Sequence, residues 1–167
     1  DKTYAHNYKT QSVFYPVELT ITNPLGCTKN ALDTIEVYPL VKAGFNITAA
    51  DGCTPLQTTA TNTSPSSQYD YVWSFGDGRA NEYTENPGTS GALTYLNDTQ
   101  NPPILLQPEL KLVASYKGDA TCIDSVSRVL NVYPHIYPDF TTDFEGCHPH
   151  EITFTNLTDA FSTNTDY

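Results

Sequence analysis

The stretch "YVWSFGDG", residues 71–78, combines an alternating strand with a tight turn. Trp73 and Phe75 lie two positions apart, so a strand directs both rings to one face, where they can fill the centre of a core. The Gly76-Asp77-Gly78 sequence that follows supplies backbone freedom and a carboxylate acceptor for a turn. These eight residues predict a buried strand that ends in a tight turn.

The same two-residue period recurs along the chain and predicts an all-β fold. Turn-forming Gly, Pro, Asn and Asp separate the alternating stretches, and no segment shows a 3.6-residue apolar stripe. About seven short strands per ~95 residues is the count of an immunoglobulin-like sandwich. The other alternating stretches are Val17/Leu19/Ile21, Phe45/Ile47, Leu56/Thr58/Ala60, Leu110/Leu112/Ala114 and Leu130/Val132.

The composition excludes several function classes. The 167 residues carry 8 Lys+Arg against 19 Asp+Glu, a net charge of −11. Nucleic-acid binding and polybasic membrane contacts both need clusters of Lys and Arg, and the sequence has none. No apolar run approaches the ~18–20 residues of a membrane span, so we expect no direct membrane insertion. Aromatic residues at 12% are too many for a disordered chain.

An internal repeat organises the sequence. "CTKNALDTIEVYP" (27–39) aligns without gaps on "CIDSVSRVLNVYP" (122–134), 95 positions later. "GCTPLQTTATNTS" (52–64) aligns on "GCHPHEITFTNLT" (146–158), 94 positions later. A period of this length suits a repeated small domain, because solenoid repeats are much shorter.

The repeat predicts three parts of the chain. Residues 1–39 are the C-terminal part of one domain, 40–134 form a complete domain, and 135–167 are the N-terminal part of a further one. Pro39 and Pro134 end the strand before each border and stiffen the short junctions. The sequence is therefore expected to be a piece of a longer protein.

The motif and the repeat together resemble a known family. "WSFGDG" (73–78) resembles the signature of the PKD domain, the immunoglobulin-like module of the polycystic-kidney-disease type. Residues 52–64 and 146–158 resemble its opening strands, and "VELTITNPLGCTKNALDTIEVYP" (17–39) resembles its closing hairpin. The order is similar to the PKD arrays of large Bacteroidetes surface proteins. Segment 79–109 is longer than the short loop and aromatic segment of the family, and is expected to be a decorated loop that could contact a partner.

The resemblance implies a structural role. Such arrays serve as spacers and display modules in adhesin-like proteins and filaments exported by type IX secretion, including gliding-motility proteins. The implied location is the extracellular cell surface. The implied partners are neighbouring repeats of the same chain, with other protein subunits or surface glycans also open. A second hypothesis is a carbohydrate-binding or spacer module beside a secreted hydrolase, which would need an exposed platform drawn from the 12 Tyr residues.

No set of residues predicts an enzyme or a cofactor site. No Ser or Cys lies in a nucleophile-elbow context, and the acidic residues are scattered. The "CHPH" sequence (147–150) could suggest a metal, but the complete copy lacks both His, so an exposed turn is favoured. Asp77, with Asp70 or Glu82, is a calcium candidate, although three acids supply few of the oxygens that calcium needs. A turn-stabilising role for Asp77 is favoured.

The four cysteines, Cys27, Cys53, Cys122 and Cys147, are disulfide candidates in a chain whose composition predicts secretion. If the immunoglobulin topology holds, roughly 36 Å of extended chain separates Cys122 from the end of the domain that holds Cys53. Bridged cysteines need Cα atoms within about 7 Å. A staple between neighbouring domains is therefore favoured, while a Cys53–Cys122 bridge and free thiols stay open.

Several residues are candidates for glycosylation. Four Asn begin Asn-x-Ser/Thr sequons, namely Asn46, Asn62, Asn97 and Asn156. Thr34 in "DTI" (33–35) and Ser125 in "DSV" (124–126) resemble the Asp-Ser/Thr-aliphatic sites that Bacteroidetes modify.

Overall fold

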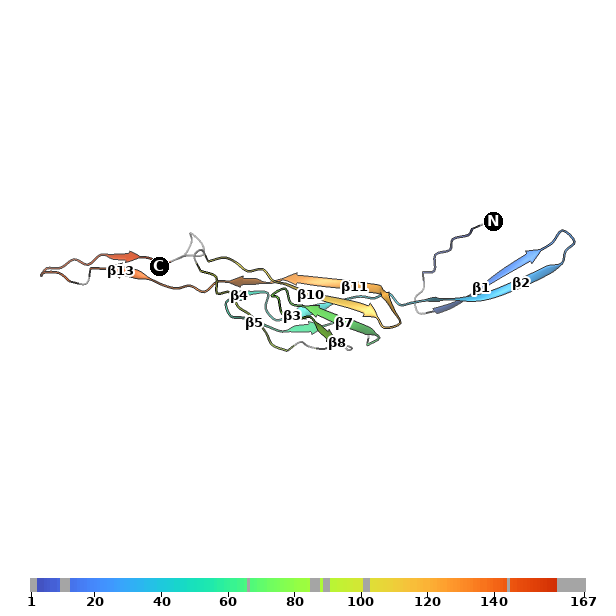
Figure 1. The fold of residues 1–167 in the computed structure, drawn as a ribbon, viewed down its shortest axis with the longest axis horizontal. Helices are drawn as coiled ribbons and strands as arrows, with labels where there is room; N and C mark the ends of the chain where they lie inside the picture. The colour runs from blue at the N-terminus through green and yellow to red at the C-terminus, as the bar shows by residue number, and fades with distance from the viewer. Residues whose placement is uncertain are drawn as a thin grey trace.

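The computed structural model describes residues 3–9, 13–65, 67–84, 88, 91–100, 103–143 and 145–158, and within them the chain forms strands and no helix. The prediction of an all-β protein is thus confirmed. Figure 1 shows an elongated molecule in which a compact centre lies between two hairpin-like ends. The strands are β1 (Val13–Thr22), β2 (Thr28–Val37), β3 (Phe45–Ile47), β4 (Asp51–Cys53), β5 (Leu56–Thr58), β6 (Ala60–Asn62), β7 (Tyr69–Ser74), β8 (Glu82–Thr84), β9 (Leu93–Tyr95), β10 (Glu109–Tyr116), β11 (Asp119–Val129), β12 (Asn131–Tyr133), β13 (Phe140–Thr142) and β14 (Phe154–Asn156).

The compact centre, residues 40–134, is sandwich-like and is called the central module below. One layer is the sheet β11-β10-β7-β8. The ladders β3–β6 and β5–β9 supply the facing strands, and β12 pairs parallel with β4 at one edge. A single cluster of buried side chains draws members from both layers, so the two layers share one core.

Trp73 lies in the middle of this core, as the alternation of 71–78 predicts. The Trp73 side chain is 2% exposed, and its ring meets the Phe45 ring edge-on at 5.2 Å between centroids. Phe45 belongs to β3 and Trp73 to β7, so this contact joins the two layers. Leu110 and Leu112 on β10 are fully buried beside it.

The turn after β7 brings two stretches of backbone close together. Gly76 and Gly78 both have positive φ angles, +72° and +84°. A Cβ on Gly76 would overlap the backbone of Glu109, whereas a Cβ on Gly78 would meet nothing within 4 Å. Gly76 is thus required both for its φ angle and for the close approach of β10.

Two predictions about strands need correction. The stretch Leu56–Ala60 is divided at Thr59, because β5 pairs with β9 whereas β6 pairs with β3. The Thr48 hydroxyl accepts a hydrogen bond from the Thr59 N–H at 3.0 Å. At this division the Thr59 N–H therefore bonds to a side chain. Segment 79–109 is also not a loop throughout, because it contains β8 and β9.

The ladder β13–β14 has the same register as the ladder β3–β6. Phe140 pairs with Asn156 as Phe45 pairs with Asn62, at offsets of 95 and 94 residues. The next hydrogen bonds also match. The Leu157 N–H donates to the Asp139 carbonyl at 2.8 Å, and the equivalent Thr63 N–H donates to the Gly44 carbonyl at 2.8 Å.

The hairpin β1–β2 likewise matches β10 and β11–β12. Val13 pairs with Val37, and the equivalent Leu106 forms a bridge with Val132. The environments differ, since Leu19 is 63% exposed whereas its equivalent Leu112 is fully buried. The β1–β2 hairpin therefore presents to solvent a row of apolar side chains that forms core in the central module.

We expect Gly76→Ala to destabilise the central module more than Gly78→Ala does. A left-handed φ costs either alanine ~1–2 kcal/mol. Overlap with the Glu109 backbone adds about 2 kcal/mol at position 76 alone. Urea unfolding followed by Trp73 fluorescence measures both variants, and equal losses of unfolding free energy would contradict the close approach of the two backbones.

Candidate functional site

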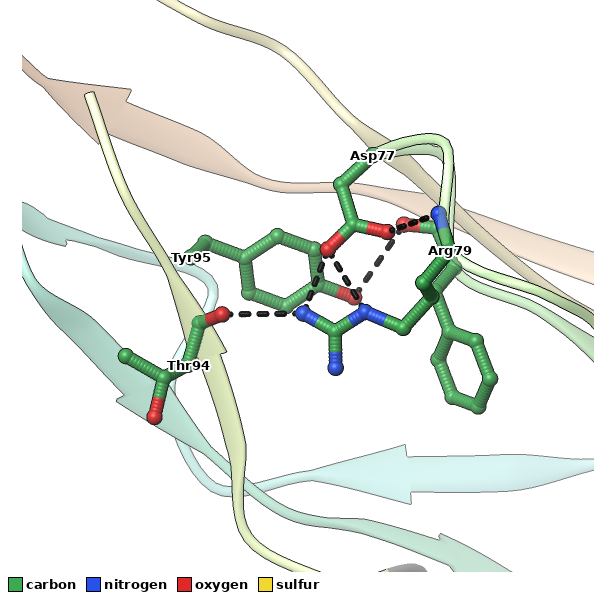
Figure 2. A network of polar contacts seen from close by, with 5 residues as sticks. Asp77, Arg79, Thr94 and Tyr95 are labelled. Carbon is green, nitrogen blue, oxygen red and sulfur yellow. Dashed lines mark hydrogen bonds and ion pairs between the residues drawn. The ribbon is translucent and has the colours of Figure 1, made fainter. Parts of the chain in front are cut away.

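Asp77 and Arg79 form an ion pair at the Gly-Asp-Gly turn, and a hydrogen bond from Arg79 joins this turn to β9 (Figure 2). The Asp77 carboxylate accepts a hydrogen bond from Arg79 Nε at 2.7 Å and forms an ion pair with Arg79 Nη2. Arg79 Nη2 also donates to the Thr94 carbonyl at 2.9 Å. The guanidinium thus ties the turn after β7 to the strand β9.

Aromatic rings complete this network. The Arg79 guanidinium carbon lies 5.2 Å from the ring centroids of both Phe75 and Tyr95, within cation–π range. The Tyr95 hydroxyl donates to the Phe75 carbonyl at 3.2 Å. Burial raises the pKa of Tyr95 to about 12, so this hydroxyl stays a donor throughout the neutral range. Arg79 was not predicted as a site residue, because its partners on β9 lie about 15 residues further along the chain.

The environment of Asp77 favours a structural role over calcium binding. Partial burial raises the pKa of Asp77, but the hydrogen bonds and the charge of Arg79 outweigh burial, and the pKa lies below its usual value. The carboxylate is therefore ionised and already engaged by a cation. Asp70 instead lies 3.8 Å from Lys117. Within the described part of the chain, no three His, Cys, Asp or Glu side chains converge as a metal site.

The pole of the central module that holds residues 38–43 is fastened to β7, β10 and β11. The Tyr38 ring lies 5.2 Å from the Tyr116 ring at the end of β10. The Ala43 N–H donates to Asp124 Oδ2 at 2.9 Å, and the Tyr69 hydroxyl donates to the Leu40 carbonyl at 3.2 Å. Contacts on three strands thus fix the direction in which the chain enters the module.

Asn97 fastens the opposite pole. Its side chain is fully buried, and Nδ2 donates to the carbonyls of Ile104 and Val132, each at 2.7 Å. The Thr54 N–H also donates to the Tyr133 carbonyl at 3.0 Å. These bonds hold the chain just before Pro134, so the exit from the module is as well defined as the entry.

The cysteines lie at separate places in the fold. In this structure no disulfide joins any two of the four. Cys53 pairs with Tyr133 at the exit pole, whereas Cys122 lines a surface hollow with Tyr38 at the entry pole. Since the chain from Cys122 to Tyr133 is almost entirely strand, it spans roughly 36 Å. A Cys53–Cys122 bridge is therefore incompatible with this fold. Cys27 and Cys147 lie between the strands of β1–β2 and of β13–β14.

The glycosylation candidates divide by exposure. Asn62 is 7% exposed and Asn97 is fully buried, so neither amide is available to a glycan in the folded module. Both instead serve the fold, since Asn62 Oδ1 accepts from the Ser64 N–H at 2.9 Å. The candidates that are exposed are Thr34, Asn46, Ser125 and Asn156.

Comparison with known proteins adds no relative: no protein-family model matches the chain, and no curated protein is significantly similar to it. Among the described residues, no helix is long and apolar enough to cross a membrane.

We expect Asp77→Asn to lower the free energy of unfolding at pH 7 by ~0.5–1 kcal/mol, the range for a partly exposed ion pair. The folded-state pKa of Asp77 is lowered, so its stabilisation is present above the usual pKa of 3.8 and is lost as pH falls through the folded value. Urea unfolding from pH 7 to pH 2.5 should show the two proteins converging. Asp70→Asn is the control, and a constant difference across this range would contradict the assignment.

Proposed function

We propose that this chain is a segment of an extended, non-catalytic surface protein built from tandem immunoglobulin-like modules of the PKD type. It serves as a spacer and attachment element outside the cell. The observation that carries the proposal is the repetition of two ladders with their registers. β13–β14 reproduces β3–β6, and β1–β2 reproduces the closing hairpin of the central module.

The exposed apolar faces at both ends support this proposal. Phe140 is 60% exposed, whereas its equivalent Phe45 is 4% exposed, and Ile21 is 61% exposed against a fully buried Ala114. Side chains that form core in one copy are expected to form core in the others. We therefore propose that each terminal ladder belongs to a module of its own, with borders at Pro39 and Pro134.

The two poles support an extended arrangement of these modules. The chain enters beside Tyr38 and leaves at Tyr133, and Figure 1 shows β1–β2 and β13–β14 on opposite sides of the central module. Hydrogen bonds from Asn97 and to Asp124 hold the backbone on the module side of each junction. A short Pro-containing junction between such fixed points is semi-rigid, which favours a rod over a compact cluster.

We further propose that the cysteines connect neighbouring modules in the longer protein. Cys53 at the exit pole would pair with a closing-hairpin cysteine of the next module, equivalent to Cys122. Each bridge forms from two thiols with loss of two protons and two electrons to a disulfide oxidant, as in an oxidising secretory compartment. The exposure of Cys53 leaves its thiol accessible to such a partner.

The alternative of a carbohydrate-binding module receives less support. Such a module needs several exposed aromatic rings on one surface. In the described part of the central module, the exposed aromatic side chains are Tyr83 and Tyr133, at 76% and 37%. Tyr83 lies on β8 and Tyr133 at the end of β12, so they do not form a common platform.

An antibody against residues 40–134 tests the proposed location and role. We expect immunogold label on intact source cells, at a distance from the membrane that a rod of modules would span. Adhesion of these cells should fall when the antibody fragment is added, relative to an unrelated fragment. Labelling that requires permeabilised cells would contradict the proposal.

Peptide mapping of the full native protein under non-reducing conditions tests the cysteine assignment. We expect the Cys53 peptide to be joined to a peptide that resembles 119–129, from the following module. A Cys53–Cys122 peptide, or alkylation of Cys53 without reduction, would overturn the assignment.

A further inference from the structure

Strand β11 leaves one edge of the main sheet open. It is the outer strand of the order β11-β10-β7-β8 and runs for 11 residues. Among the residues that the structure describes, only β10 pairs with it. An outer strand of this length presents a row of backbone donors and acceptors that can accept another strand.

The alternation of hydrogen bonds identifies which groups lie on the open edge. The Leu130 N–H donates toward β10, to the Pro108 carbonyl at 3.0 Å. The next residue, Asn131, donates to the other side, to the Ala50 carbonyl at 2.8 Å. Since successive residues of a strand alternate, the N–H and C=O groups of Ser125, Ser127 and Val129 point away from β10.

The register of β10–β11 is continuous through this stretch, so the alternation holds along it. Ile123 pairs with Ser115 and Val129 pairs with Glu109 without a shift between them. The Ser127 carbonyl accepts a hydrogen bond at 3.2 Å from Nη1 of the adjacent Arg128, whose guanidinium carbon also lies 5.9 Å from the centroid of the Phe45 ring. Ile123 and Val129 are 59% and 53% exposed on the outer face of the sheet.

We propose that β11 pairs antiparallel with β11 of a second copy of this chain, about a two-fold axis through Val126. In this register Asp124, whose Oδ2 also accepts a hydrogen bond from the Ala43 N–H of its own chain, faces Arg128 of the second copy. The symmetry repeats this opposite-charge pair. Ser125 faces Ser127, and Ile123 faces Val129. Hydroxyl and apolar positions thus face residues of the same kind, and the charged positions face opposite charges. The open backbone groups of the odd-numbered residues also face each other, as an antiparallel ladder requires.

The equivalent strand in the other copy of the repeat, β2, carries two charges at the same spacing but with their signs exchanged. Lys29 and Asp33 on β2 stand 95 positions before Asp124 and Arg128. Antiparallel pairing of β2 with β2 would again join opposite charges. Pairing β2 with β11 in the equivalent register would place Asp33 against Asp124 and Lys29 against Arg128. The charges therefore favour pairing between equivalent strands and oppose pairing between different ones.

The overall charge sets the conditions of the test. Two chains of net charge −11 repel each other at low ionic strength. At 0.15 M salt the screening length is about 8 Å. Screening of this range weakens the repulsion between whole chains more than it weakens a direct ion pair such as Asp124 with Arg128 of the second copy. We therefore expect the association to strengthen between about 10 mM and 150 mM salt.

Sedimentation velocity of the full chain, with reductant present, tests the pairing. We expect a dimer whose fraction rises with protein concentration. Arg128→Asp places a carboxylate against Asp124 at both symmetry-related positions and should weaken dimerisation by about ten-fold or more. Lys111→Asp on β10 carries the same charge change away from the open edge and should leave dimerisation unchanged.

Cross-linking tests the register. In a background of Cys27→Ser, Cys53→Ser, Cys122→Ser and Cys147→Ser, Val126→Cys should form a dimer on mild oxidation. Its two Cα atoms would lie about 4.5 Å apart, a distance that suits a disulfide. Tyr83→Cys on the opposite edge strand is the control and should remain monomeric.

Three results would overturn the pairing: a monomer at all protein concentrations in 150 mM salt, a dimer insensitive to Arg128→Asp, or equal cross-linking at positions 83 and 126. Thermal unfolding of each variant shows whether the fold is retained. A monomeric chain would leave the proposal of a tandem surface rod untouched, because that proposal depends on contacts along the chain and not between chains.

Discussion

The contact between Trp73 and Phe45 is the interaction on which the central module depends. Neither layer can be stable alone, since one is a four-stranded sheet with an apolar face and the other consists of short two-stranded ladders. The aromatic pair, with 5.2 Å between ring centroids, joins the two layers, and fully buried Leu110 and Leu112 belong to the same core. The Gly-Asp-Gly turn that follows β7 then has to pass close to β10, which explains why Gly76 cannot carry a side chain.

Local periodicity and the repeat predicted a large part of this fold. The alternation around Trp73 and in residues 110–114 predicted which side chains are buried, because a strand repeats every two residues. The alignment of 52–64 on 146–158 predicted a ladder whose register the structure reproduces. The division at Thr59 was missed, because the partners of β5 and β6 are strands elsewhere in the chain, which local periodicity does not reveal.

The polar residues that organise the turn and the poles were harder to predict. Asn97 belongs to a sequon and suggested a glycan, yet its amide is buried and bonds to Val132, 35 residues further along the chain. Arg79 sits beside a recognisable turn, but its carbonyl partner on β9 is set by the sandwich topology. In both cases the chemistry of the side chain was visible, while its partner depended on contacts between distant segments. The open edge of β11 was hard to predict for the same reason. Its charges can be read in the sequence, but its exposure follows from the strand order.

The parallel pairing of β4 with β12 has a mechanical consequence. The chain enters the module at the pole of Tyr38, and its first segment reaches β4 at the far pole, where β12 also ends. Tension on the two ends of the module would draw β4 and β12 in opposite directions along their length. The hydrogen bonds at Asn131 and Tyr133 would then be loaded in shear and would have to break together, whereas a peeled hairpin breaks its bonds one at a time. The arrangement therefore resists extension better than the small number of its hydrogen bonds suggests.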